Sequence, residues 1–315
     1  MQLVSEPKIE RRSWSHDSRR WAQYRPRPGD IIVATSAKCG TTWTQQIVSL
    51  LVFQSPAPRS IGEVSPWIDH RTRPIEEVIA QIEAQTHRRF LKSHLAFDAM
   101  PIYDDVRYIH TARDGRDAFM SWHNHSSNYS PMILEAFDAA GMADETVAAP
   151  LPRAAKSPAE FFDNWIIEGP EAEKRNDFSC NKFFEIEKSY WRQRARPNLL
   201  MVHYNDLKAD LSGEMRRIAE FLDINIPESL WPELVEAARF ETMKKNGPQI
   251  MPHATMAWDN GHERFLFKGS NERWRGVLSD DQLARYETRV KNELEPELAA
   301  WLAKGRLAAG NPKLS

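Results

Sequence analysis

Four short apolar segments constrain the fold of this chain more than any other sequence feature. They cover residues 30–35, 89–91, 107–112 and 198–203, and polar residues follow each of them. Apolar residues at helical spacing come after the first, third and fourth segments, which indicates strands that alternate with helices. Such alternation is typical of a parallel sheet covered on both faces. The sequence therefore predicts an α/β fold, a single domain with a central parallel sheet flanked by helices.

Composition restricts the function classes. The chain has 315 residues, of which 41% are hydrophobic and 27% are charged, and its net charge is −2. This balance gives no reason to expect a nucleic acid or a membrane as partner, and no segment reaches the ~18 apolar residues of a membrane helix. Residues 1–14 lack the apolar centre of a signal peptide, and two cysteines cannot build a disulfide framework. We therefore expect a cytoplasmic protein.

Residues 34–48, ATSAKCGTTWTQQIV, are typical of an anion-binding loop. A loop that leads into a helix offers unpaired backbone N–H groups and the positive end of the helix dipole. Gly40 allows close approach, Lys38 adds a positive charge, and Thr41 or Thr42 is expected to cap the helix. The lysine precedes the glycine, however, so the loop does not match the GxxxxGK[ST] pattern of nucleoside triphosphate loops.

Polar residues follow all four predicted strands, and Lys38, His94, Arg113 and Tyr204 are the most informative of them. In parallel sheets the ligand lies at the carboxyl ends of the strands, so we expect these side chains to converge on one crevice. No strand end supplies an obvious acidic ligand for magnesium, which argues against a kinase.

Several motifs in a fixed order resemble the cytosolic sulfotransferases. The loop Ser36–Trp43 resembles the family pattern PKSGTTW, with Ala37 and Cys39 in place of proline and serine. The further motifs, in chain order, are Lys92–Leu95, Arg113–Ser121, Tyr204–Leu207, Phe240 with Met243–Lys245, and Lys268–Gly269 with Trp274. The resemblance implies a P-loop-like sulfotransferase fold, divided into an N-terminal arm (1–20), a sulfotransferase domain (21–300) and a C-terminal tail (301–315).

The family transfers the sulfuryl group of 3′-phosphoadenosine 5′-phosphosulfate (PAPS), a co-substrate, to a hydroxyl or amine of a small-molecule acceptor without a metal. Positioning and charge stabilisation supply most of the catalysis in such a transfer. The resemblance implies that Lys38 contacts the 5′-phosphate and its bridging oxygen. Thr41 and Thr42 are implied to hold the same phosphate together with the Cys39 and Gly40 amides.

His94 matches the general base of the family. A neutral imidazole can accept the proton of the acceptor, although a lone histidine can also be purely structural. Lys92 lies two residues earlier in an extended segment and so points to the same side, where the resemblance implies that it steadies the sulfuryl oxygens. We therefore expect Lys38, Lys92 and His94 to be catalytic.

The resemblance also implies which residues bind the rest of the donor. Arg113 and Ser121 match the pair that holds the 3′-phosphate, although Arg113 could instead form an ion pair with Asp114 or Asp117. The full set of these binding positions is Trp43, Arg113, Ser121, Tyr204, Phe240, Phe267, Lys268 and Gly269. In that set Trp43 and Phe240 are implied to enclose the adenine. Phe267 stands where better-studied animal members have arginine, which Arg273 could offset.

Two other functions stay open at this stage: a P-loop kinase-like transferase that uses ATP, and a catalytically silent nucleotide-binding protein. The Cys39 thiol could have a lowered pKa at a helix N-terminus, or the residue could replace serine through its backbone alone. His123 and His125 could be read as a metal pair, but we expect them to line the acceptor pocket and expect no metal.

The sequence does not name the acceptor or the oligomeric state. Four aromatic residues suggest an apolar acceptor pocket unless they belong to the core: Phe97, Trp122, Phe161 and Trp165. The dimer element of animal members, KxxxTVxxxE, does not occur after Trp274, so a dimer of that type is unsupported.

Overall fold

A four-stranded parallel sheet forms the centre of the structure, a computed structural model that describes residues 1–168 and 179–314. Its strands are β2 (Ile31–Ala34), β3 (Phe90–Ser93), β5 (Arg107–Ala112) and β6 (Leu199–His203), in the order β3-β2-β5-β6. Ile31 pairs with Phe90 on one side and Arg107 on the other, and Tyr108 pairs with Leu199. The four predicted strands and the parallel α/β architecture are confirmed.

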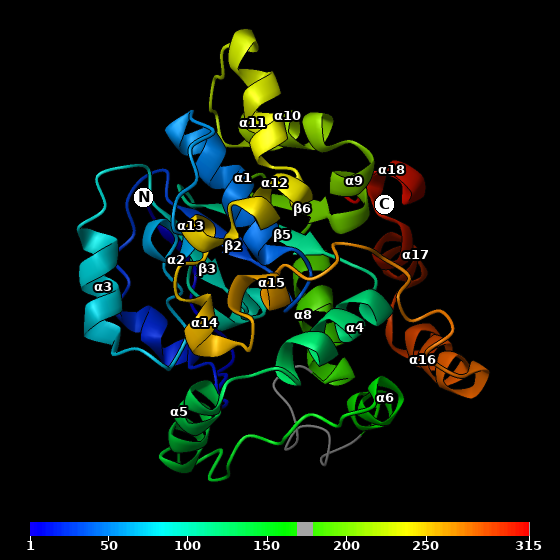
Figure 1. Cartoon of the computed structure of the whole chain (residues 1–315). Coiled ribbons are helices and arrows are strands. Elements are labelled where there is room, and N and C mark those ends of the chain that lie inside the picture. Colours follow the sequence, from blue (N-terminus) through cyan, green and yellow to red (C-terminus); the bar gives the residue numbers. More distant parts are fainter. Residues whose placement is uncertain (169–178, 315) are drawn as a thin grey trace.

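Helices cover both faces of this sheet because both faces are apolar. Along β2, Ile31 and Val33 point into one hydrophobic cluster, whereas Ile32 and Ala34 point into another. The first cluster includes residues of α1 (Thr41–Phe53), α10 (Leu211–Phe221) and α11 (Trp231–Ala237). The second includes residues of α4 (Gly115–Ser126), α6 (Pro158–Trp165) and α8 (Cys180–Trp191). Figure 1 shows these two sets of helices on opposite sides of the sheet.

The other elements surround this centre. A short antiparallel pair joins β1 (Leu3–Ser5) to β4 (Ile102–Tyr103), and the 3₁₀ helices are η1 (Ser18–Gln23), η2 (Phe97–Ala99) and η3 (Glu228–Leu230). The further helices are α2 (Ile61–Val64), α3 (Ile75–Glu83), α5 (Pro131–Met142), α9 (Tyr204–Ala209), α12 (Phe240–Lys245), α13 (Gly247–Ile250), α14 (Ala254–Ala257), α15 (Gly261–Phe265), α16 (Asp280–Glu293), α17 (Pro296–Lys304) and α18 (Arg306–Ala309). Among the described residues, no helix has the length and apolarity to cross a membrane.

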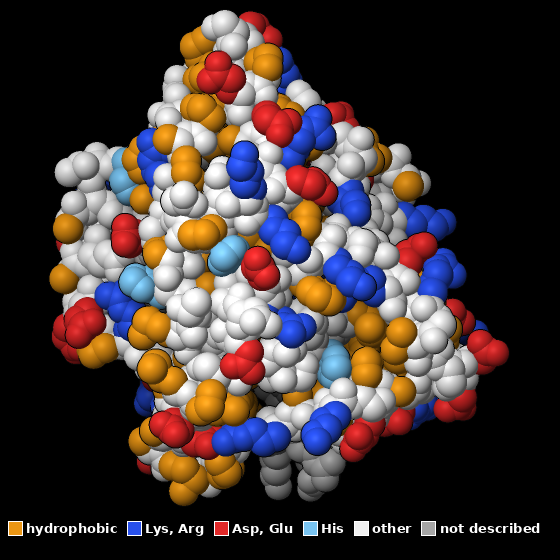
Figure 2. All heavy atoms as spheres, viewed as in Figure 1, with side chains coloured by type: hydrophobic (Ala, Val, Ile, Leu, Met, Phe, Trp, Pro, Cys, Tyr) orange, Lys and Arg blue, Asp and Glu red, His pale blue; other side chains and the backbone are white. Residues whose placement is uncertain are grey.

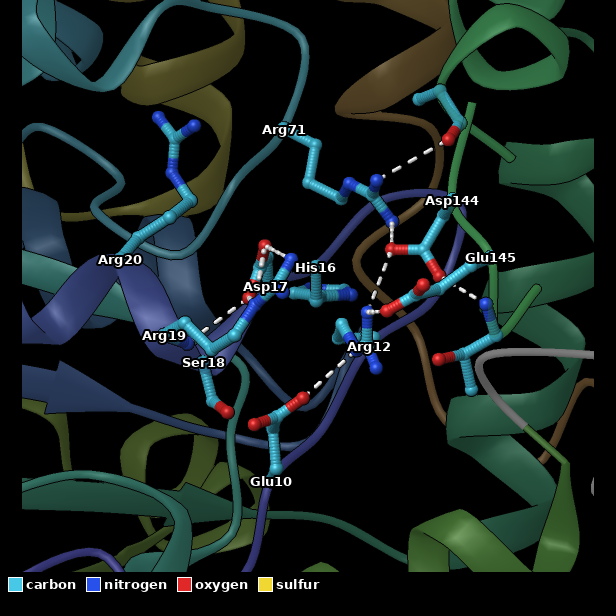
Figure 3. A network of polar contacts seen from close by, with 12 residues as sticks. Glu10, Arg12, His16, Asp17, Ser18, Arg19, Arg20, Arg71, Asp144 and Glu145 are labelled. Carbon is cyan, nitrogen blue, oxygen red and sulfur yellow. Dashed lines mark hydrogen bonds and ion pairs between the residues drawn. The ribbon is translucent and has the colours of Figure 1, made fainter. Parts of the chain in front are cut away.

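The segment 11–18 packs against the body of the molecule. The Trp14 indole N–H donates to the Ala149 carbonyl at 2.8 Å, and Arg71 donates to the Ser13 carbonyl at 2.6 Å. Figure 3 shows the polar network at this junction. The buried Asp144 carboxylate forms ion pairs there with Arg71 and Arg12, with nitrogen-to-oxygen distances of 3.1 Å and 3.7 Å. The boundaries at residues 20 and 300 stay a prediction, and Trp301 beyond the second one is buried.

Candidate active site

A cavity of about 450 Å³ lies at the carboxyl ends of the parallel strands. Lys38, His94, Arg113 and Tyr204 all line it, so the predicted convergence of the strand ends is confirmed. Nearly all the other expected site residues line the same cavity: Gly40, Thr41, Thr42, Trp43, Lys92, Ser121, Phe240, Phe267, Lys268 and Gly269. Cys39 is the one expected site residue outside this lining.

The loop between β2 and α1 has the backbone of an anion site. Lys38 and Gly40 both have positive φ, 65° and 109°, and a Cβ atom on Gly40 would lie 3.1 Å from the Tyr204 ring. Gly40 is the N-cap of α1, so the expected threonine cap is wrong, and no side chain caps this end. The first-turn amides therefore remain available to an anion.

The Cys39 side chain points away from the cavity. Cys39 is fully buried, and its Sγ lies 3.7 Å from the Ala37 carbonyl oxygen. Burial raises the pKa of the Cys39 thiol well above its usual value, with the Glu187 carboxylate acting in the same direction. The idea of a lowered thiol pKa is wrong, because desolvation here outweighs the helix N-terminus.

The His94 ring is oriented by the backbone of the loop. Its Nδ1 lies 2.8 Å from the Thr35 carbonyl oxygen, which can only accept, so Nδ1 carries the proton and the basic lone pair lies on Nε2. Burial first, and then the charge of Lys92, lower the pKa of His94 well below its usual value. The ring is therefore neutral and able to accept a proton.

The two lysines lie beside neutral groups. Lys38 Nζ lies 3.3 Å from His125 Nδ1 and 4.2 Å from the centre of the Phe265 ring, and Lys92 Nζ lies 3.6 Å from that of Trp67. Burial, followed by repulsion from Lys92, lowers the pKa of Lys38 to about 7. Burial lowers the pKa of Lys92 to about 8. Neither ammonium forms an ion pair with a carboxylate among the described residues.

The charges of the cavity have one sign. The basic residues that line it are Lys38, Arg73, Lys92, Arg113, Lys268 and Arg273, and no aspartate or glutamate of the described residues joins them. Uncompensated positive charge in a partly buried site is costly, and it favours binding of a highly charged anion.

Arg113 is held by neutral acceptors. Its guanidinium donates to Asn271 Oδ1 at 2.6 Å and to the Ser270 carbonyl at 3.0 Å, and it stacks over the Tyr204 ring at 4.0 Å. Asp114 instead forms an ion pair with Arg116, and Asp117 Oδ1 accepts the Glu272 backbone N–H at 2.6 Å. The alternative of an ion pair between Arg113 and Asp114 or Asp117 is therefore wrong. The Arg113 charge remains available to a ligand.

Aromatic residues form the wall next to Arg113. The Trp43 ring meets Tyr204 edge-on at 5.2 Å, and its indole N–H donates to the Ala238 carbonyl at 2.8 Å. A Cβ atom on Gly269 would lie 2.7 Å from the Phe240 ring, so only glycine lets this loop approach so closely. Arg273 lies 5.4 Å from the Phe267 ring centre and faces the cavity.

Apolar side chains line another part of the cavity wall. Trp122 and His125 belong to it, as expected, whereas Phe97, Phe161 and Trp165 are packed in the hydrophobic core. His123 Nε2 lies 3.0 Å from the Ala155 carbonyl oxygen instead. In the part of the chain that the structure describes, no three histidine, cysteine or acidic side chains are grouped as metal ligands would be.

Comparison with known proteins gives this site a context. Residues 28–298 match the sulfotransferase domain. The chain belongs to the sulfotransferase family. A glycolipid sulfotransferase of Mycobacterium tuberculosis is 35% identical over 308 residues, 94% of each chain, and human sulfotransferase 1C2 is 22% identical over 288 residues, 87% of each chain.

Solved structures show the same fold as this sulfotransferase. Retinol dehydratase in complex with androsterone and the inactive cofactor PAP superposes with a TM-score of 0.66 at 23% identity, covering 86% of this chain and 82% of that one. Mouse SULT7A1 complexed with PAP superposes with a TM-score of 0.63 at 15% identity, covering 87% of each chain. The expected sulfotransferase fold and activity are confirmed.

The sequence reasoning missed one part of the site of this sulfotransferase. Trp67 and His70 line the cavity from the irregular segment between α2 and α3. Their rings stack with centres 4.0 Å apart, and Trp67 meets His94 edge-on at 4.8 Å. No periodicity marks residues in such a segment. The only signal was the short aromatic and polar sequence PWIDH at residues 66–70.

Proposed function

We propose that this sulfotransferase moves the sulfuryl group of PAPS to a neutral hydroxyl of an apolar small molecule, with His94 as general base. The observation that carries the proposal is the cavity in which His94 and six basic side chains come together, with no carboxylate of residues 1–168 or 179–314 in its lining. A donor with a 5′-phosphosulfate and a 3′-phosphate supplies the negative charge that such a lining requires.

The residues present fit this donor at both of its anionic ends. The 5′-phosphosulfate is assigned to the α1 amides, Lys38, Thr41 and Thr42, because the helix start is uncapped and faces the cavity. The remaining donor contacts are assigned to Trp43, Arg113, Ser121, Tyr204, Phe240, Phe267, Lys268 and Gly269, and Arg273 supplies the charge that Phe267 lacks.

The reaction needs no metal in this proposal. The acceptor oxygen attacks sulfur, the bond from sulfur to the bridging phosphate oxygen breaks, and the acceptor proton moves to His94 Nε2. Lys38 and Lys92 stabilise the charge that develops on the leaving oxygen and on the sulfuryl oxygens. The lowered pKa is about 7 for Lys38 and about 8 for Lys92, so both lysines carry nearly full charge only at about one pH unit or more below 7.

The acceptor end favours a neutral, largely apolar molecule. Among the described residues, no acidic side chain lines the cavity to pair with an ammonium group, and the apolar wall includes Trp122, Tyr129, Phe137, Trp258 and Phe265. Next to wall residues, Met132 of α5 and Met256 of α14 are more than half exposed, and Figure 2 shows hydrophobic side chains gathered over α5 at the lower left. A lipid-like alcohol suits this surface, and a relative named glycolipid sulfotransferase supports that choice.

A cytoplasmic location also belongs to this proposal. Both cysteines, Cys39 and Cys180, are free and buried, which suits a reducing compartment.

Transfer from labelled PAPS tests the function. The wild-type protein is incubated with PAPS and a panel of lipid alcohols, phenols and amines, in the presence of a metal chelator, and the labelled product is measured. Transfer to hydroxyl acceptors that His94→Ala abolishes supports the proposal. The proposal fails if no acceptor is labelled and calorimetry detects no binding of the desulfated nucleotide PAP. In a separate assay without the chelator, turnover of ATP that depends on magnesium would instead favour a kinase.

A further inference from the structure

Asp69 holds two elements of the site through one buried carboxylate. Its side chain is fully buried, and Oδ2 accepts the Trp67 indole N–H at 2.9 Å and the His94 backbone N–H at 3.2 Å. Oδ1 accepts the Trp21 indole N–H at 3.3 Å. The carboxylate does not line the cavity, so it acts through the groups that it holds and through its charge, which raises the pKa of Lys92 against the effect of burial.

Trp67 lies between this carboxylate and the catalytic lysine. Its ring face lies 3.6 Å from Lys92 Nζ, and the backbones of the two residues form a parallel bridge. The Lys92 backbone N–H donates to the Pro66 carbonyl at 2.9 Å. Both the backbone and the side chain of Lys92 therefore contact the segment that contains Trp67. The edge of the His94 ring completes the group, 4.8 Å away between ring centres.

The chemistry explains why an aromatic face suits this place. A lysine side chain has several rotatable bonds, and an unpaired ammonium in this cavity could point in many directions. A carboxylate would hold it but would also neutralise the charge that the sulfuryl oxygens need. An indole face attracts the cation through its quadrupole and leaves the positive charge intact. The indole can do this only if its own orientation is fixed, as the bond to Asp69 does.

We propose that Trp67 and Asp69 are positioning residues for sulfuryl transfer. Trp67 holds the Lys92 ammonium beside the transferring group, and Asp69 fixes both the Trp67 indole and the His94 backbone. The inference rests on the proposed function, because that function assigns Lys92 to the sulfuryl oxygens and His94 to the acceptor proton. It extends that function to residues that do not touch the reacting atoms.

Single-turnover rates with saturating PAPS and acceptor test the role of Trp67. Trp67→Leu should lower the rate roughly tenfold, the range of a desolvated cation–π contact, while PAP affinity stays within twofold. Trp67→Phe keeps a ring face and should retain most of the rate. Phe53→Leu removes the ring under Arg59, 4.1 Å away and outside the cavity, and serves as the matched control.

A double-mutant cycle separates positioning from simple packing. In a Lys92→Met background, Trp67→Leu should lower the single-turnover rate little further, because the ammonium that the ring holds is gone. An equal fold-loss in both backgrounds would overturn the role of Trp67. If wild type transfers sulfate and Trp67→Leu matches it, this inference fails while the proposed function stands. If wild type transfers nothing, the function itself fails.

Asp69→Leu tests the second part, because it has a similar volume and no acceptor oxygen. It should lower the single-turnover rate and also reduce the rate difference between Trp67 and Trp67→Leu, because the indole N–H has lost its acceptor. A thermal melt shows whether the variant folds. If it does not fold, Asp69→Glu keeps the charge, and the same reduction is expected because its carboxylate is displaced. A full Trp67 effect in a folded Asp69 variant would refute the role of Asp69.

Discussion

Donor binding should weaken as pH rises through neutrality, because Lys38 binds the donor in its charged form. The pKa of Lys38 is lowered to about 7 by burial and by repulsion from Lys92, Arg113 and Arg273. A bound anion favours the ammonium and therefore raises this pKa. The affinity should be constant below the pKa of the free protein and should fall as pH rises above it.

The size of the effect follows from the lowered pKa of Lys38. If only the ammonium form binds, the Kd for PAP should increase by about 25-fold between pH 6.5 and pH 8.5. The second ionisation of a phosphate monoester lies near pH 6, below this window, so it adds little. Lys92 is assigned to the sulfuryl oxygens, which PAP lacks, so its titration should add to the effect mainly with PAPS.

Calorimetry of PAP binding in buffers of different ionisation enthalpy measures both affinity and proton uptake. Wild type should take up close to one proton on binding at pH 8, and Lys38→Arg should take up almost none, because arginine does not titrate. The Kd of Lys38→Arg should stay nearly flat across the window. A flat Kd for wild type, without proton uptake, would refute the reasoning.

Three further changes have defined outcomes. His94→Ala should lower kcat by at least about 100-fold, the contribution of a general base, with PAP affinity within twofold; an equal loss of PAP binding would contradict this role. Arg113→Lys should weaken PAP about tenfold, because a fork of donors becomes a point charge; adenosine 5′-phosphate, which lacks the 3′-phosphate, serves as the comparison ligand and should change less than twofold. Gly40→Ala should cost about 1–3 kcal/mol of stability at its φ of 109° and weaken PAP, whereas Gly276→Ala, at a φ of 71° outside the cavity and with open space around it, should cost similar stability in thermal melts and leave PAP affinity unchanged in calorimetry.

The sequence predicted the sheet and the basic residues that line the cavity because both depend on local signals. A strand such as 107–112 is a buried apolar run, and the loop 34–41 carries its glycine and lysine in a short, ordered pattern. Parallel strands must bring their carboxyl ends to one edge, so the meeting of Lys38 with His94 and Arg113 followed from the fold class alone.

The parts of the site that the sequence did not predict depend on contacts between distant segments. Trp67 and Asp69 belong to an irregular segment whose position is set by β3 and by residues 16–21, and no local pattern encodes that position. Whether an aromatic residue lines a cavity or fills the core is likewise decided by tertiary packing, which separated Trp122 from Phe161. The two interpretations of Cys39 stayed open from the sequence for the same reason, since its environment is the buried side of the loop.

The junction of segment 11–18 with the body bears on the order of events during synthesis. Trp14 leaves the ribosome long before its partner Ala149, which lies 135 residues later in the chain. Arg12 is likewise synthesised long before its partner Asp144. Segment 11–18, which contacts His94 through His16 and Asp69 through Asp17, therefore completes its packing only after about half of the protein has emerged. Nascent chains stopped before that point should leave Trp14 open to solvent and to protease cleavage nearby.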